Sequence, residues 1–172
     1  MAAVVSPDSS KVYVASGLPN TVSVIDTSTN TVSAVIPLGS SPGGLALTPD
    51  GTTLYVSAGT PSGGTVLVID TSTNAITTTV KVGDAPQQLA ASPDGKAIYV
   101  PCSSDIEIIS TASNQVTATV RAPGQAEPTQ VLFDRDGTDA YVVCQVTQLR
   151  NGELGAFANQ YQFVKSGGVS VE

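Results

Sequence analysis

The chain repeats one sequence unit at a spacing of a little over forty residues, and this repeat constrains the fold more than any other feature. The unit combines V-x-V-I-D-T-S-T-N, a Thr/Val run, G-x-x-P, a short apolar stretch, a P-D-G turn and a Y-V pair. The clearest copies begin at Val22 and Val66, and a degenerate copy begins at Ile106. The turn aspartate recurs with separations of 42, 44 and 42 residues, at Asp8, Asp50, Asp94 and Asp136. A period of this length, built only from strand and turn signals, predicts one β-propeller blade per repeat.

Each repeat predicts four short strands. In the second copy they cover residues 45–48, 53–58, 65–70 and 75–82. Pro49-Asp50-Gly51 suits a tight turn, because proline fits its second position and glycine its last. The Gly/Pro/Ser-rich residues 59–64 predict a loop between the second and third strands. The third strand is apolar at consecutive positions, so we expect neighbouring blades to cover both of its faces.

We therefore predict an all-β fold, a β-propeller of four-stranded antiparallel blades that forms a single domain over residues 1–172. About four blades are expected, three clear and one diverged, at approximately 3–38, 39–82, 83–122 and 123–172. Residues 145–168 break the pattern, and Asn151-Gly152 predicts a hairpin turn there. Small propellers can close with four blades, but the usual ring is larger. We expect this chain to be a fragment of a larger ring or a partner in one, with open blade faces that favour self-association.

Composition and charge exclude several classes of function. The formal net charge is −7, and the 7 basic residues do not cluster, so nucleic-acid binding is not predicted. No apolar run approaches the roughly 18 residues that span a bilayer, so membrane insertion is not predicted either. The N-terminal stretch lacks the basic start and apolar core of a signal peptide. Histidine is absent, which removes the commonest general base and transition-metal ligand, and we predict no cofactor.

The two cysteines, Cys102 and Cys144, lie one repeat apart, each just after a Y-V-x. Equivalent positions on neighbouring blades should exceed the roughly 7 Å Cα separation that a disulfide tolerates. Ser16 and Ala58 fill the same position in the earlier copies. We therefore predict two small buried thiols rather than a disulfide or a reactive pair.

The repeat resembles the YVTN family of β-propeller repeats. The matching elements are VSVIDTSTNTV from Val22, the P-D-G turn and the Y-V-x-S at Tyr55-Val56-Ser57, within a resemblance over about residues 3–143. The resemblance implies the propellers, typically seven-bladed, of bacterial and archaeal surface, periplasmic or secreted proteins. It carries over no catalytic residues, because the shared motif is architectural.

The most plausible binding surface lies at the end of each blade that does not carry the conserved turns. The P-D-G and D-T-S-T-N turns close hairpins at one end, whereas the loops at the opposite end differ between copies. Propellers usually place binding groups on such variable loops. The candidate residues on this rim are Asn20, Asp84, Gln87, Gln88, Asp105, Gln125, Glu127 and Gln130. Gln87, Gln88 and Gln130 are the better candidates, because they flank the strand starts nearest the ring centre.

One acidic stretch suggests a metal alternative. Asp134, Asp136 and Asp139 superficially resemble a calcium loop, since Ca²⁺ prefers clustered carboxylate oxygens. The stretch lacks the distal glutamate of an EF-hand loop. The simpler interpretation is a fourth copy of the P-D-G turn.

Three functions remain open. The first is a non-catalytic scaffold that binds a protein or a glycan in a surface or secreted protein, which the repeats and the lack of catalytic motifs favour. The second is a propeller-type lyase or hydrolase whose active residues lie mainly in blades outside this chain. The third is a purely structural or assembly unit.

Overall fold

The computed structural model describes residues 2–60, 63–122, 126–146, 149–150, 153–154 and 158–165, and these residues form an all-β partial propeller. The first two blades are four-stranded antiparallel meanders. Blade 1 contains β1 (Ala2–Val5), β2 (Lys11–Gly17), β3 (Asn20–Asp26) and β4 (Thr31–Pro37). Blade 2 contains β5 (Pro42–Leu47), β6 (Thr53–Thr60), β7 (Gly63–Asp70) and β8 (Ala75–Val82). None of the described residues belongs to a helix that could span a membrane.

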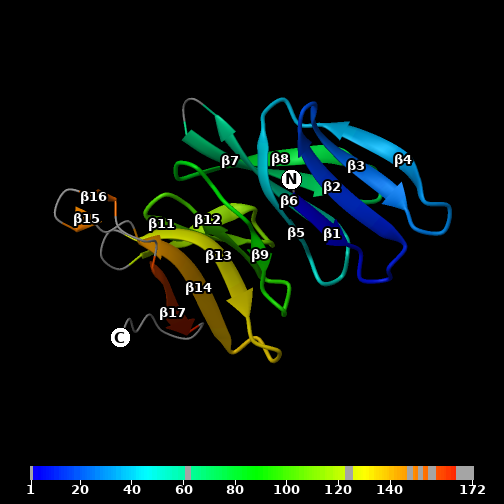
Figure 1. Cartoon of the computed structure of the whole chain (residues 1–172). Helices are drawn as coiled ribbons and strands as arrows, with labels where there is room; N and C mark the ends of the chain where they lie inside the picture. Colours follow the sequence, from blue (N-terminus) through cyan, green and yellow to red (C-terminus); the bar gives the residue numbers. More distant parts are fainter. Residues whose placement is uncertain are drawn as a thin grey trace.

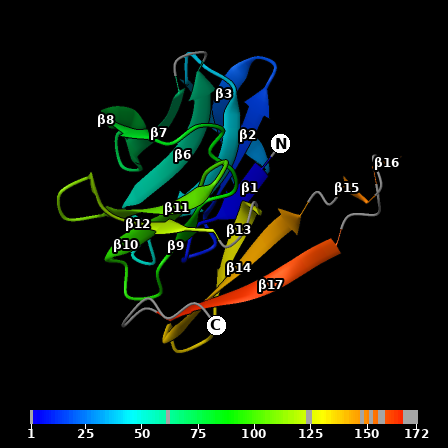
Figure 2. The same ribbon diagram turned by 90° about the vertical axis from the view of Figure 1, so that its left-hand side faces the viewer.

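Blade 3 repeats this meander, whereas blade 4 departs from it. Blade 3 contains β9 (Ala90–Ala91), β10 (Ala97–Pro101), β11 (Asp105–Ser110) and β12 (Gln115–Arg121). Blade 4 contains β13 (Glu127–Phe133), β14 (Asp139–Val146) and β17 (Ala158–Lys165), with a separate pair, β15 (Leu149–Arg150) and β16 (Glu153–Leu154), between the last two. Figure 2 shows β17 alongside β14 at the outer edge of this blade. The predicted turn at Asn151-Gly152 lies outside the described residues.

The blades pack face to face, with their first strands side by side. β1, β5, β9 and β13 follow one another near the middle of the molecule (Figure 1). The hydrophobic cores lie between consecutive blades: Tyr13 and Val22 of blade 1 pack with Val56 and Ile69 of blade 2. Blades 2 and 3 share a second core, and blades 3 and 4 a third. This arrangement explains the consecutive apolar residues of the third strand, because each face of an inner sheet is buried against a neighbour.

The tyrosine of the Y-V pair belongs to these contacts. Tyr55 is buried, and its hydroxyl donates a hydrogen bond of 2.8 Å to Oδ1 of Asn114 in the next blade. Asn114 has a φ of 52°, and its equivalents Asn30 and Asn74 have φ values of 54° and 55°. Asparagine is among the few residues that adopt this left-handed conformation readily. The repeated asparagine thus closes its own turn and, in blade 3, binds the preceding blade.

Two sequence predictions about local structure can be compared directly with the fold. The predicted loop over residues 59–64 is shorter in the structure, because β6 continues to Thr60 and β7 starts at Gly63. Backbone pairing of Gly59 with Gly64 extends the hairpin despite its glycine content. The prediction of two buried, unpaired thiols is confirmed, since Cys102 and Cys144 are both buried and free.

Candidate functional site

The antiparallel meander places two kinds of connection at opposite ends of each blade. One end, the turn end, carries the P-D-G turns and the turns after the third strands. The other end, the variable-loop rim, carries the connections between second and third strands and the links between blades. Leu18, in the β2–β3 connection of the rim, is 94% exposed. The rim therefore offers the loops that differ most between copies.

The aspartates of the turn end are engaged in their own turns. Asp8 Oδ1 accepts hydrogen bonds from the Ser6 hydroxyl at 2.6 Å and from the Ser10 backbone N–H at 3.0 Å. These bonds, that from Ser6 first, lower the pKa of Asp8 to about 2. Asp50 is bound in the same way by Thr48 and Thr52, and its pKa is also lowered. A carboxylate held by its own backbone stabilises the turn, so these residues are poor candidates for ligand binding.

On the rim, Asp84 and Asp105 come together where blades 2 and 3 meet. Ser103 joins the two loops, because its backbone N–H and its hydroxyl both donate to the Asp84 carbonyl, at 2.9 and 3.1 Å. The Cys102 N–H donates to the Asp105 carbonyl at 2.8 Å, and the Gln87 N–H donates to the Pro101 carbonyl at 2.8 Å. Asp84 thus lies on the link after β8, and Asp105, which was also predicted on a loop, is the first residue of β11; backbone hydrogen bonds tie the two segments together.

Glu107 of β11 completes this group, although the sequence reasoning missed it. Burial raises the pKa of its carboxyl, a hydrogen bond from the Gly83 N–H opposes that shift, and Asp105 raises the pKa further. Oε2 of Glu107 and Oδ1 of Asp105 are buried and have no hydrogen-bond partner among the described residues. A polar side chain between Ile106 and Ile108, where the other copies read V-S-V and V-L-V, was the available signal.

The thiol beside these carboxyls is not an activated nucleophile. Cys102 is buried, and burial first, then the charges of Glu107 and Asp105, raise the pKa of its thiol to about 12. A nucleophilic cysteine requires the thiolate, which a lowered pKa provides. Cys102 is therefore protonated at neutral pH and fills space in the core shared by blades 2 and 3.

The remaining predicted rim residues have different surroundings. Asn20 is the first residue of β3, far along the chain from the acidic group, and Gln87 is exposed with its Nε2 donating to the Ala85 carbonyl at 3.2 Å. Gln88 donates from Nε2 to the Leu45 carbonyl at 2.8 Å, so its amide joins blades 2 and 3. Gln125 lies outside the described residues.

Glu127 and Gln130 were predicted on a loop, and this placement was wrong. Both belong to β13, which begins at Glu127 and pairs with β14 from its first residue. An irregularity in the pairing between Pro128 and Gln130 allows the strand to start this early. Both side chains remain exposed.

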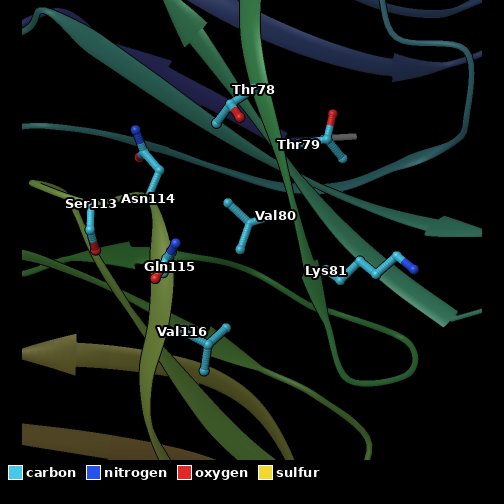
Figure 3. A pocket seen from close by; sticks show the side chains of 8 residues that line it. All are labelled: Thr78, Thr79, Val80, Lys81, Ser113, Asn114, Gln115 and Val116. Atoms are coloured by element: carbon cyan, nitrogen blue, oxygen red, sulfur yellow. The ribbon is translucent and has the colours of Figure 1, made fainter.

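A polar groove, with a volume of about 510 Å³, runs between the outer part of blade 2 and the β11–β12 turn of blade 3. In Figure 3, Val80 and Val116 lie at its centre, with Ser113 and Asn114 on one side and Lys81 on the other. A smaller hollow of about 270 Å³ lies at the turn end, between the P-D-G turns of blades 2 and 3. Neither belongs to the rim, and the repeat pattern did not predict them.

The calcium alternative gains no geometric support. Asp134 accepts hydrogen bonds from the Asp139 N–H and the Thr138 hydroxyl, both at 3.0 Å, and Asp136 accepts one from that hydroxyl at 2.8 Å. The Gly137 N–H donates to the Asp134 carbonyl, as the Gly51 N–H does to Thr48. Within the described part of the chain, no three acidic, cysteine or histidine side chains gather as metal ligands. The stretch is the fourth copy of the turn.

Comparison with known proteins agrees with this architecture. A family model described as YNCE-like beta-propeller matches residues 2–168. A solved structure described as Kuenenia stuttgartiensis hydrazine synthase has a TM-score of 0.64 and 23% identity, with 96% of this chain and 62% of that chain covered. Another, described as dihydro-heme d1 dehydrogenase NirN in complex with DHE, has a TM-score of 0.72 and 16% identity, with 99% and 36% covered. No curated protein sequence matches.

The two solved structures are longer than this chain. This chain spans less than two thirds of each of these two structures. At these identities the likeness concerns the fold alone, and the propeller prediction is confirmed. Membership of the YVTN family, and the surface location that it implies, stay predictions.

Proposed function

This chain belongs to the YNCE-like β-propeller family, whose model spans residues 2–168, and from that premise we propose a non-catalytic scaffold that binds a protein or a glycan at its variable-loop rim. The observation that carries the proposal is the pair of buried carboxyl oxygens of Asp105 and Glu107 without a partner among the described residues. Buried acceptors of this kind are costly unless a donor reaches them. A hydroxyl of a sugar or an N–H of a protein side chain supplies that donor.

The surroundings of these carboxyls favour binding over catalysis. Asp84, Gln87 and Ser103 are exposed beside them and add further polar groups to the same surface. Cys102 supplies no thiolate at neutral pH, as its raised pKa requires. The lyase or hydrolase alternative thus loses a cysteine nucleophile at this site, and the names of the two similar enzymes support only the shared fold.

The test measures binding to arrays of immobilised oligosaccharides and of synthetic peptides. We expect the wild-type chain to bind members of one array and the double variant Asp105→Asn, Glu107→Gln to lose that binding at least tenfold, because each amide replaces a carboxylate acceptor partly by a donor. Gln115→Ala, in the groove of Figure 3, is the matched control and should bind normally. Binding that survives the double variant but fails in the control would assign the function to the groove instead.

The cellular location is part of the same proposal. The Y-V-x-S repeat resembles that of surface, periplasmic and secreted propellers, and an exposed binding rim suits such a location. Fractionation of the native host with an antibody against the chain tests it. Signal confined to the cytosolic fraction would contradict it.

A further inference from the structure

The groove of Figure 3 differs from the rim in that one of its walls is the edge of a sheet. Its lining consists of residues 78–81 of β8 and residues 113–116, from the β11–β12 turn into β12. β8 is the outermost strand of blade 2, since the sheet runs in the order β5, β6, β7, β8. Among the described residues no strand pairs with its outer edge. The groove therefore follows a row of backbone groups that a further strand can bind.

The register of the outer strands shows which backbone groups face this open edge. In blade 1 the Leu38 N–H donates to the Asn20 carbonyl at 2.9 Å, which places the preceding residue, Pro37, in a pair that exchanges no hydrogen bonds with β3. Lys81 holds the place of Pro37 in blade 2, because each lies opposite the equivalent threonine of the third strand. The N–H and carbonyl groups of Lys81, and of Thr79 two residues before it, thus point away from β7.

Blade 1 protects the same edge, whereas blade 2 leaves it open. Proline has no N–H, so Pro37 removes the donor that a further strand would bind on β4. Lys81 keeps that donor on β8. Val35, two places before Pro37, corresponds to Thr79, so the open edge of blade 2 is also the more polar one.

A bulge sets the length of the usable edge. The pairing of β7 with β8 shifts between Val68 and Ile69, and the Thr77 hydroxyl donates to the Val68 carbonyl at 3.1 Å beside this irregularity. From Thr78 to Val82 the two strands pair without interruption. Such a length of antiparallel strand extends over about 17 Å. The regular part of the edge therefore accommodates a short extended segment, and it includes all the residues of β8 that line the groove.

The other surfaces of the groove suit the side chains of such a segment. Val80, which is 7% exposed, and Val116 lie at the centre of the groove and form an apolar floor. Beside them, Asn114 is held by the Tyr55 hydroxyl, which donates to its Oδ1 at 2.8 Å. That bond leaves the amide N–H groups of Asn114 as donors at this side of the groove. A strand added to β8 would direct every second side chain toward blade 3, where Val116 and Asn114 lie.

The charge of the groove indicates the kind of segment. Lys81 is the only charged residue in the lining, is exposed, and makes no ion pair within the described part of the chain. No carboxylate lines the groove, although the whole chain has a net charge of −7. An ammonium group without neighbouring carboxylates favours an acidic ligand. The lining also contains no aromatic ring on which a sugar could stack, so a peptide suits the groove better than a glycan.

From these observations we propose that the groove binds an extended, acidic segment of a partner protein, which pairs with β8 as a fifth strand of blade 2. The backbone of the segment bonds to the outward N–H and carbonyl groups of Thr79 and Lys81, and one of its carboxylates lies beside the Lys81 ammonium. This site is separate from the variable-loop rim, where Asp84, Asp105 and Glu107 would repel an acidic segment.

Fluorescence polarisation of the full chain with two labelled heptapeptides tests the site. One peptide alternates valine with glutamate and the other valine with lysine, and we expect the glutamate peptide to bind more tightly. Lys81→Gln removes the charge but keeps the backbone donor, and should weaken this binding about two- to fivefold, the usual effect of one exposed ion pair. Lys81→Pro also removes the N–H and should weaken binding about tenfold.

Lys96→Gln is the matched control, because it removes an equal charge from an exposed lysine at the turn end, and it should bind like the wild type. Amide hydrogen exchange followed by NMR gives a second measurement that needs no variant. The N–H groups of Thr79 and Lys81 should exchange more slowly when the glutamate peptide is bound. This result remains decisive if Lys81→Pro fails to fold.

Several results would overturn the proposal. Failure of the glutamate peptide to bind, equal binding of the two peptides, or unchanged exchange at Thr79 and Lys81 would each exclude strand addition at this edge. Equal losses in Lys81→Gln and Lys96→Gln would show that the peptide responds to the net charge of the chain and not to the groove. Tighter binding of a trimer of galacturonic acid than of the glutamate peptide would assign the groove to acidic glycans instead.

Discussion

At the scale of single residues, the tyrosine of the Y-V pair and the asparagine of the turn can each be explained by a contact between neighbouring blades. Asn114 suits a left-handed turn position, and its side-chain oxygen accepts a hydrogen bond from Tyr55 of the preceding blade, whereas Oδ1 of the equivalent Asn74 is buried without a partner among the described residues. Tyr55 fills the core between blades 2 and 3 and donates to that oxygen of Asn114. In this pair the tyrosine contacts the following blade and the asparagine the preceding one, so the two residues join blades 2 and 3.

The Tyr55–Asn114 bond should therefore contribute measurable stability. Tyr55→Phe and Asn114→Gly each remove one partner, and glycine keeps the positive φ at position 114. A double-mutant cycle in urea should give a coupling energy of about 0.5–1.5 kcal/mol, the usual value for one intramolecular hydrogen bond. Strictly additive effects of the two substitutions would show that the bond contributes nothing.

The role of the rim residues stays a prediction, but the structure shows what surrounds each one that it describes. Asp84 and Asp105 were proposed because these connections vary between copies, and backbone hydrogen bonds tie the two segments together. Glu107 was missed because it stands within a strand motif, where only its charge distinguishes it from Leu67 and Ser23. Gln88 was chosen for its place near the ring centre, and its amide bonds to the neighbouring blade. Partners from another blade cannot be read from one repeat.

At the scale of elements, strands were predictable wherever the repeat is intact. β8 covers residues 75–82, as predicted, because a polar turn and a Thr/Val run define both of its ends. In blade 4 the turn still matches, but β13 begins at Glu127 and the chain inserts β15 and β16 before β17. The pairing of β17 with β14 depends on contacts across the sheet, which the degenerate sequence no longer encodes locally.

Close packing of the first strands near the ring centre should make Gly44 intolerant of a side chain. A Cβ added there would lie 2.6 Å from Cα of Gln88, a backbone atom of the next blade that cannot move freely. We expect Gly44→Ala to destabilise the fold by about 1–3 kcal/mol, the usual cost of overpacking. Urea unfolding monitored by circular dichroism measures the change.

Gly59→Ala is the matched control for this prediction. It is also a strand glycine of blade 2, but an added Cβ would have nothing within 4 Å. Its effect should stay within about 0.5 kcal/mol, as for most surface substitutions. If Gly44→Ala and Gly59→Ala lost equal stability, the loss at Gly44 would come from restriction of the backbone and not from contact with the next blade.

At the scale of the whole molecule, the stability comes from cores between blades and from turns that are fixed by carboxylates. Six turn aspartates have lowered pKa values, and all accept hydrogen bonds from nearby hydroxyls and backbone N–H groups: Asp8, Asp26, Asp50, Asp70, Asp94 and Asp136. All six lie at the turn end, so one end of every described blade depends on ionised carboxylates. Glu107 at the rim differs from these aspartates, because burial raises the pKa of its carboxyl and folding therefore favours its protonated form.

Acid should therefore unfold the protein through its turn end. The pKa of a turn aspartate lies below its unfolded value of 3.8, at about 2 for Asp8, so its stabilising contribution is complete above 3.8 and is lost as the pH falls toward 2. Glu107, with a folded pKa above 4.5, instead gains stability as the pH falls through the region just above that value. The melting temperature followed by circular dichroism should thus hold or rise slightly on initial acidification and then fall steeply below about pH 4.

Glu107→Gln should remove the initial gain, and Asp8→Asn should flatten the fall, whereas Gln87→Ala should leave both unchanged. A profile that declines steadily from neutral pH, or one that Asp8→Asn does not alter, would show that the turn carboxylates do not govern acid stability.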